Sequence, residues 1–150
     1  MKVIANLFFI IVSIGLQSCN STVKSVYRDD FRSASKTEIE KVEKEVNAKS
    51  SKRSVLVLTQ IYKGEKIIVS QNGKTIYSEY PITNLKSKIA DYFSINNLED
   101  VLIKDSNSGK EIIIPTKKSN KYKYIYVMKK VTKGKFQYVI TYSNTLRPLK

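Results

Sequence analysis

The sequence contains no histidine and no tryptophan, and its single cysteine is Cys19. Without histidine, the chain lacks the commonest general base of enzymes and the commonest protein ligand of transition metals. One cysteine can form neither an internal disulfide nor a zinc site built from cysteine and histidine ligands. The composition therefore argues against imidazole-based catalysis and against metal sites of these kinds, and no cofactor is expected.

Acidic residues are also scarce. The 150 residues carry 27 Lys and Arg against 13 Asp and Glu, which gives a formal charge of +14 at pH 7. A chain of this length has room for one domain, since domains span about 100–200 residues. So basic a chain attracts polyanions in a salt-dependent way, including anionic lipid head groups, acidic glycans, nucleic acid and acidic proteins.

Only one long apolar run is present, and it stands at the amino terminus. Met1-Lys2 is followed by predominantly apolar residues from Val3 to Leu16. A positive start before a short apolar stretch is typical of secretory signal peptides, and the stretch is too short to favour a transmembrane helix. We therefore expect residues 1–18 to be a signal peptide. The alternatives are an uncleaved membrane anchor and an ordinary signal peptide followed by a coincidental cysteine.

The run ends in Leu16-Gln17-Ser18-Cys19, which resembles the lipobox of bacterial lipoproteins. The resemblance implies cleavage before Cys19 and lipid, palmitate included, on that cysteine; removal of Lys2 lowers the charge by one, to +13. Several acyl chains anchor a protein stably, because each buried methylene contributes about 0.8 kcal/mol. By lipoprotein sorting rules, Asn20 implies the outer membrane, and the lack of acidic residues over 20–23 favours its periplasmic face. Nucleic acid is not an expected partner in the envelope.

The carboxy-terminal part adds to this resemblance. Tyr124-Ile125-Tyr126-Val127, the stretch from Tyr138 to Asn144, and Arg147 look like the endings of small uncharacterised lipoproteins of Gram-negative bacteria. The likeness covers only the two ends of the chain. It implies an anchored β domain and brings no known activity with it.

The mature chain is predicted to consist of a lipidated tether over residues 19–52 and a β domain over residues 53–150. Ser, Thr and charged residues dominate positions 20–36, as in a spacer. Ser35-Lys36-Thr37-Glu38 resembles a capping box, and apolar residues at helical spacing then predict a short helix over 36–48. Its apolar stripe is narrow, so we expect it to lie loosely on the domain or to belong to the tether.

From Val55 onward, the apolar residues recur with a period of two between turn signals. Asn72-Gly73 between two apolar runs predicts a hairpin with a type I′ turn. Residues 85–94 alternate imperfectly and favour a strand over a helix. The pattern predicts about seven or eight strands, and hence an all-β fold: a small antiparallel sandwich, of which the immunoglobulin arrangement is one form, or a small barrel.

Tyrosines and lysines alternate in the strand that begins near residue 121. Tyr122, Tyr124 and Tyr126 share one face, and Lys121 and Lys123 begin the other. Aromatic rings beside lysines can stack on bases or sugars while the cations hold anionic groups, so these five residues form the candidate binding face. Tyrosine is also a good strand former that packs its ring in a core, and we favour this structural interpretation.

Lysines are densest over residues 117–135, at both ends of the last predicted hairpin. They can serve as solvated strand edges that prevent aggregation, or they can rest on anionic head groups once lipid has localised the domain. The members are Lys117, Lys118, Lys121, Lys123, Lys129, Lys130, Lys133 and Lys135.

Carboxylates are the only remaining candidates for catalysis. Asp29 with Asp30, Glu99 with Asp100, and Asp105 with Glu111 are neighbours in the sequence, and paired carboxylates can cleave glycosides. A recognisable set of acid, base and nucleophile is missing, so we expect no enzyme. The sequence predicts a membrane-anchored envelope lipoprotein acting as a binding or structural module. A small envelope hydrolase using carboxylates, and an inhibitor or immunity lipoprotein that binds a protein partner, are the alternatives.

Overall fold

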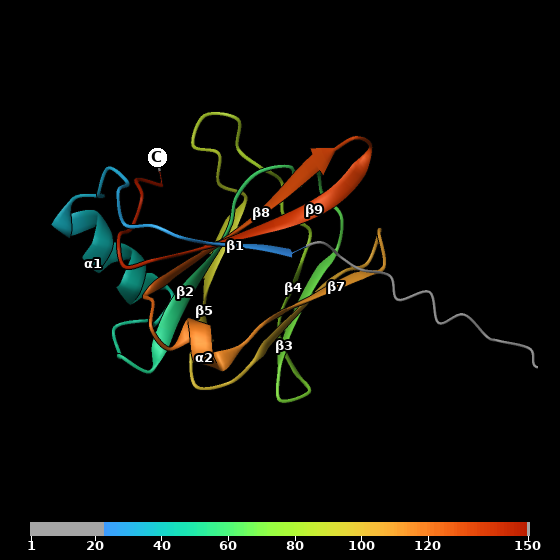
Figure 1. Cartoon of the computed structure of the whole chain (residues 1–150). Coiled ribbons are helices and arrows are strands. Elements are labelled where there is room, and N and C mark those ends of the chain that lie inside the picture. The colour runs from blue at the N-terminus through green and yellow to red at the C-terminus, as the bar shows by residue number, and fades with distance from the viewer. Residues whose placement is uncertain (1–22, 150) are drawn as a thin grey trace, which may run out of the picture.

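The computed structural model describes residues 23–149 as an all-β sandwich of two sheets with two short helices (Figure 1). The predicted signal peptide, Cys19 and the start of the predicted tether lie outside the described residues. The elements in chain order are β1 (Val23–Tyr27), α1 (Lys36–Glu45), β2 (Arg53–Leu58), β3 (Ile67–Gln71), β4 (Lys74–Glu79), β5 (Asp91–Asn96), β6 (Val101–Asp105), β7 (Lys110–Ile114), α2 (Thr116–Ser119), β8 (Tyr124–Thr132) and β9 (Lys135–Ser143).

The described strands form one sheet in the order β1-β9-β8-β2-β5 and a second in the order β4-β3-β6-β7. The all-β prediction is confirmed as a sandwich, and the sheets are not closed into the alternative barrel. Most strand pairs are antiparallel, as predicted, and two are parallel: β1 with β9 and β2 with β8. Parallel partners need long connections. Here the connection between β2 and β8 along the chain contains all four strands of the second sheet.

Local turn chemistry sets the hairpins. Asn72 and Gly73 both adopt positive φ, 48° and 72°, as the predicted type I′ turn between β3 and β4 requires. Lys133 and Gly134 repeat this pattern between β8 and β9, with φ of 51° and 72°. Both turns join antiparallel partners; the β8–β9 pairing is regular along both strands, whereas the β3–β4 register shifts between Val69 and Ser70.

The five-stranded sheet is buried on both faces. Leu56 and Leu58 of β2 face the second sheet, whereas Val55 and Val57 of the same strand face α1. Successive side chains of a strand point to opposite faces, so the four residues of β2 from Val55 to Leu58 are all apolar. In Figure 1, α1 lies on the side of this sheet away from β3, β4 and β7.

Helix α1 belongs to the folded domain and is more than a loose cover. The Ser35 side chain accepts a hydrogen bond from the Glu38 backbone N–H at 3.2 Å, which caps the helix as predicted. Val42 is buried against the sheet, and Asn47 with φ of 54° ends the helical path before residue 48. The prediction of a helix is confirmed with a shorter carboxy-terminal end.

The segment expected to be a spacer contains strand β1. Val23 lies opposite Tyr138 and Tyr27 opposite Tyr142, where the two tyrosine rings stack with centroids 5.2 Å apart. Beyond the strand, Asp29 accepts a hydrogen bond from the Ser143 hydroxyl at 2.8 Å. The prediction of a tether over the whole of 20–36 is therefore wrong for this part, because an edge strand needs few large apolar residues to hold its place.

Candidate functional site

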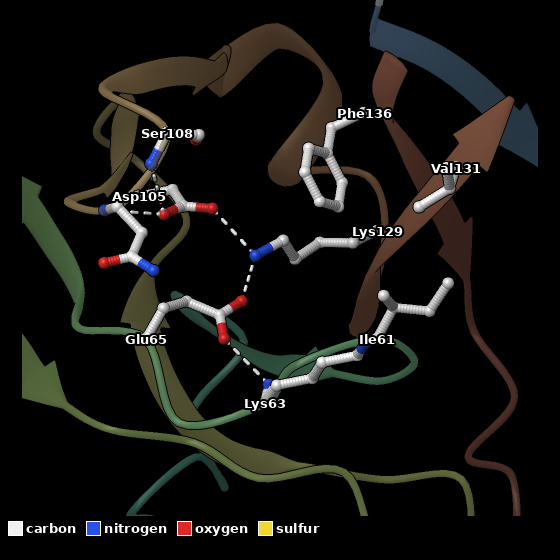
Figure 2. Close-up of a pocket in the computed structure, with 9 residues that line it drawn as sticks. Ile61, Lys63, Glu65, Asp105, Ser108, Lys129, Val131 and Phe136 are labelled. Atoms are coloured by element: carbon white, nitrogen blue, oxygen red, sulfur yellow. Dashed lines mark hydrogen bonds and ion pairs between the residues drawn. The ribbon is translucent and has the colours of Figure 1, made fainter. Parts of the chain in front are cut away.

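Three charged side chains meet at one end of the sandwich (Figure 2). Glu65 lies in the loop before β3, Asp105 ends β6, and Lys129 lies within β8. The Nζ of Lys129 is 2.7 Å from Oδ2 of Asp105 and also contacts Oε1 of Glu65. The side chains of Lys129, Glu65 and Asp105 are 5%, 7% and 2% exposed, so this charged cluster is shielded from water.

The two carboxylates of the charged cluster have further partners. Asp105 accepts from the Tyr138 hydroxyl at 2.9 Å and from the backbone N–H of Asn107 at 3.0 Å. Glu65 accepts from the backbone N–H of Lys63 at 2.7 Å. Among residues 23–149, no buried side-chain nitrogen or oxygen lacks a partner. The charged cluster thus satisfies its own hydrogen bonds, as buried charges must.

The cluster keeps both carboxylates ionised. Burial opposes ionisation of Asp105, but the Lys129 ammonium and the hydrogen bonds from Ser108 and Tyr138 outweigh it and lower the pKa of the Asp105 carboxyl. Burial is likewise the largest influence on Glu65, and Lys129 together with the Lys63 backbone N–H still lowers its pKa. The charged cluster thus joins three segments of the fold. Because both carboxylates are paired with Lys129, they are poorly suited to proton transfer.

A cavity of about 290 Å³ opens beside the charged cluster. Ile61, Val131 and Phe136 form its apolar walls, and Lys63 and the loop at 107–108 add polar groups. The Nζ of Lys129 lies 5.5 Å from the centroid of the Phe136 ring, so that ring covers the buried ammonium.

A second, larger hollow of about 640 Å³ shares Ile61, Lys63 and Val131 with this cavity. We call it the apolar groove and define it by Ile61, Tyr62, Ile82, Leu85 and Val131. Ile82, Leu85 and Val131 are 67%, 82% and 47% exposed. Lys63 and Lys88 also line the groove, so that cations stand beside exposed apolar side chains.

The backbone at the groove is strained. Ile61 has φ of 69°, a left-handed conformation that a β-branched residue adopts at a cost of about 1–3 kcal/mol. Its neighbour Tyr62 is fixed by two bonds to Thr83: the Tyr62 N–H donates to the Thr83 hydroxyl at 3.0 Å, and the Thr83 N–H donates to the Tyr62 carbonyl at 2.9 Å. Such strain concentrates at binding and catalytic sites.

The predicted tyrosine row does not form an exposed face. Tyr124 and Tyr126 are 3% and 2% exposed, on the α1 side of the sheet. The Tyr124 hydroxyl donates to Glu43 Oε1 at 2.7 Å, and the Tyr126 hydroxyl donates to the Thr145 carbonyl at 2.9 Å. Tyr122 precedes β8 and packs, half-buried, against the core between the sheets. The three rings therefore cannot stack on one ligand, and they agree with the packing interpretation.

The two lysines of the candidate binding face also separate. Lys121 is exposed, whereas the Nζ of Lys123 donates to the carbonyls of Arg53 at 3.2 Å and Ser50 at 3.3 Å and also contacts that of Ala48. Lys123 thus joins the residue before β8 to the start of β2 and to the segment between α1 and β2.

The lysines predicted as one basic region divide between the two ends of the sandwich. Lys118 reaches β1, where its Nζ donates to the Ser25 hydroxyl at 2.9 Å. Lys130 and Lys133 are exposed near the β8–β9 turn, and Lys129 is in the charged cluster. These lysines therefore do not form a single patch.

Two of the carboxylate pairs named for the hydrolase alternative are separated or held by other partners. Asp105 faces the core, whereas Glu111 is exposed and lies 3.3 Å from Lys104. Asp29 accepts hydrogen bonds from the Ser143 hydroxyl at the end of β9 and from the Asn144 N–H, and Asp30 pairs with Arg28 at 2.6 Å. Asp105 and Glu111 cannot act on one bond from opposite faces of a sheet.

Sequence reasoning missed Glu65 as the partner of Lys129. A signal for the site is present, since Ile125, Val127 and Lys129 occupy alternate positions of one strand. A lysine on the inward face of a strand requires a buried carboxylate nearby. The sequence does not say which acid provides it, because Glu65, in a loop, and Asp105, at the end of β6, are both distant from Lys129 along the chain.

No protein-family model matches the chain, and no curated protein matches it significantly. Among the helices of residues 23–149, none has the length and apolar character needed to cross a membrane.

Proposed function

We propose that the protein is a lipoprotein of the cell envelope, cut before Cys19 and anchored by lipid on that residue, whose sandwich is a non-enzymatic binding module. The signal peptide and the lipobox support the anchor, and the outer membrane, on its periplasmic face, is the proposed location. The apolar groove is the observation that supports a binding role.

The groove has the chemistry of a ligand site. Binding sites are concave and mostly apolar, with a few polar groups that orient the ligand, and they measure about 300–1,000 Å³. The apolar groove combines exposed Ile82, Leu85 and Val131 with the ammonium groups of Lys63 and Lys88. An amphiphilic partner with apolar and anionic parts therefore fits it best.

The anchor is tested by replacing Cys19 with serine. We expect the Cys19→Ser variant to incorporate no radiolabelled palmitate, because serine offers no thiol to the acylating enzymes. Ser18→Ala is the matched control, since alanine keeps a small residue at the cleavage position and labelling should persist. Labelled palmitate on the Cys19→Ser chain would contradict the proposed anchor.

The groove is tested with 1-anilinonaphthalene-8-sulfonate, a dye that is both apolar and anionic. We expect the folded full-length protein to bind the dye and Leu85→Asp to weaken binding at least about tenfold, because a carboxylate then stands in the apolar wall. Leu98→Asp is the control, since Leu98 is 54% exposed outside the groove. Equal dye binding by the two variants would contradict the groove as the binding site.

A further inference from the structure

The chain enters the sandwich at the end that carries the charged cluster and the apolar groove. Val23, the first residue of β1, lies opposite Tyr138, and Tyr138 lies opposite Lys129 of the charged cluster. Because β1 runs parallel to β9, the residues before Val23 connect to the same end as the β8–β9 turn. We call this the loop end; it comprises the loops at 59–66 and 80–90, the loop at 106–109 and the hairpin tip at 129–136.

The distance between the anchor and the loop end is limited by the chain. Four peptide units separate Cys19 from Val23, and four residues span at most about 14 Å when fully extended. The strands β8 and β9 have nine residues each, or about 30 Å. Lipid on Cys19 therefore keeps the loop end near the membrane and leaves the end with α2 on the far side.

The exposed side chains of the loop end suit a membrane surface. Exposed apolar groups and cations occur together there, which is the composition of interfacial membrane-binding surfaces. The exposed large apolar side chains are Tyr80, Ile82, Leu85, Val131 and Phe136, and the exposed lysines are Lys63, Lys86, Lys88, Lys130 and Lys133.

Few acids of the loop end oppose this charge. Glu65 and Asp105 are neutralised in part by Lys129 in the charged cluster. Asp91 is half-buried and accepts from the Tyr77 hydroxyl at 2.7 Å, which leaves Glu79 as the exposed carboxylate of residues 79–91. The exposed face of the loop end is thus positive and complementary to anionic phospholipid.

From these observations we infer that the sandwich docks its loop end on the anionic phospholipid surface that holds its own lipid, with the apolar groove against the head groups. The inference rests on the proposed anchor at Cys19 and names the partner of the apolar groove. Anchoring supplies a high local concentration, so contacts too weak to hold a free protein suffice. Each lysine near an anionic surface strengthens docking about fivefold.

The experiment uses the purified, acylated protein in phosphatidylcholine vesicles with and without phosphatidylglycerol. Cys19 is the only native cysteine and its thiol is acylated, so an introduced cysteine is the single labelling site. A fluorophore is attached to Leu85→Cys at the loop end or to Leu98→Cys, which lies between β5 and β6 at the opposite end. Quenching by nitroxide head-group lipids reports contact with the membrane.

We expect strong quenching of the Leu85→Cys label in vesicles with phosphatidylglycerol and little quenching of the Leu98→Cys label. Changing Lys63, Lys88 and Lys133 to glutamine should weaken docking about a hundredfold, and 1 M salt should act similarly because it shortens the screening length to about 3 Å. Equal quenching of the two labels, or quenching that is indifferent to phosphatidylglycerol, would overturn the inference.

Mass spectrometry of the amino-terminal peptide separates this failure from failure of the anchor. If Cys19 is acylated and the two labels are quenched alike, the proposed anchor stands and the docking inference alone is wrong. If Cys19 carries no acyl chain, the proposed anchor is wrong and the inference falls with it.

Discussion

Replacing Lys129 with methionine should lower the free energy of unfolding by about 3–5 kcal/mol, because it leaves two buried carboxylates without their cation. Methionine keeps the unbranched apolar stem of lysine, so the change removes mainly the charge. Urea unfolding followed by circular dichroism at pH 7 measures the loss. Lys130→Met is the matched control: the neighbouring side chain is exposed, and its replacement should change stability by less than about 0.5 kcal/mol.

The pH dependence of this loss follows from the charged cluster. The folded pKa values of Glu65 and Asp105 are lowered, so these groups stabilise the native protein above their ordinary pKa values of about 4. That contribution is lost as the pH falls through the lowered values. In Lys129→Met the cation is gone, so burial raises the pKa values of the two carboxyls. Their protonation removes the buried negative charge and restores part of the stability that the variant has lost. The stability gap should therefore begin to narrow above about pH 4, where the carboxyls of the variant take up protons, and it should keep narrowing as the pH falls; a constant gap from pH 7 to pH 3 would contradict the assignment.

A compensated variant distinguishes charge from packing. Adding Glu65→Gln and Asp105→Asn to Lys129→Met removes the whole set of charges, and replacing all members of a buried ion pair costs far less than removing one. We expect the triple variant to be more stable than Lys129→Met. If it is less stable, the two carboxylates left without their cation are not the cause of the loss in Lys129→Met, and the assignment of the loss to charge is wrong.

Tyr126→Ala should lower the free energy of unfolding by about 3–5 kcal/mol, the range for truncating a buried aromatic ring. The ring is 2% exposed and meets Phe31 edge-on, with centroids 5.6 Å apart. Its hydroxyl also accepts from the Arg147 backbone N–H at 2.9 Å, so the change frees the carboxy-terminal segment. Thermal and urea unfolding measure the loss, and Tyr80→Ala, at a 62% exposed ring, should have little effect.

Alkaline pH provides a second readout for Tyr126. Burial raises the pKa of Tyr126 to about 12, despite the opposing hydrogen bond from Arg147. A raised folded pKa means that the tyrosine stabilises the fold below its ordinary pKa of about 10 and that this contribution is lost as the pH rises toward about 12. Tyr126→Phe should flatten this part of the stability profile. A steep alkaline loss that is unchanged in Tyr126→Phe would assign it to other groups.

Local patterns explain most of what the sequence predicted about the fold. Asn72-Gly73 and Lys133-Gly134 determine their own turns, and the alternation of apolar residues indicates strands whatever their partners. The predicted strand over 85–94 shows the limit, since β5 begins only at Asp91. The Asn84 side chain accepts from the N–H groups of Lys86 and Ser87 and closes a turn that competes with the strand pattern.

Pairings between distant segments could not be predicted in this way. β1 has few large apolar residues, and its strand conformation depends on its pairing with β9. The charged cluster is equally non-local: the inward position of Lys129 is visible in the alternation of β8, but the approach of Glu65 and Asp105 depends on both sheets. For the tyrosines, alternation assigned a shared face correctly to Tyr124 and Tyr126 and could not tell that α1 covers it.

The pairing of the first described strand with the last has a consequence for how the protein folds. β1 is synthesised before all the other described strands, and its partner β9 comes after all of them. Closing so long a loop is entropically expensive, and folds dominated by distant pairings form slowly. Until β9 has emerged, β1 has no neighbour and β8 has one open edge, and such edges recruit strands of other chains. A chain that ends before β9 should therefore aggregate rather than fold to a smaller sandwich.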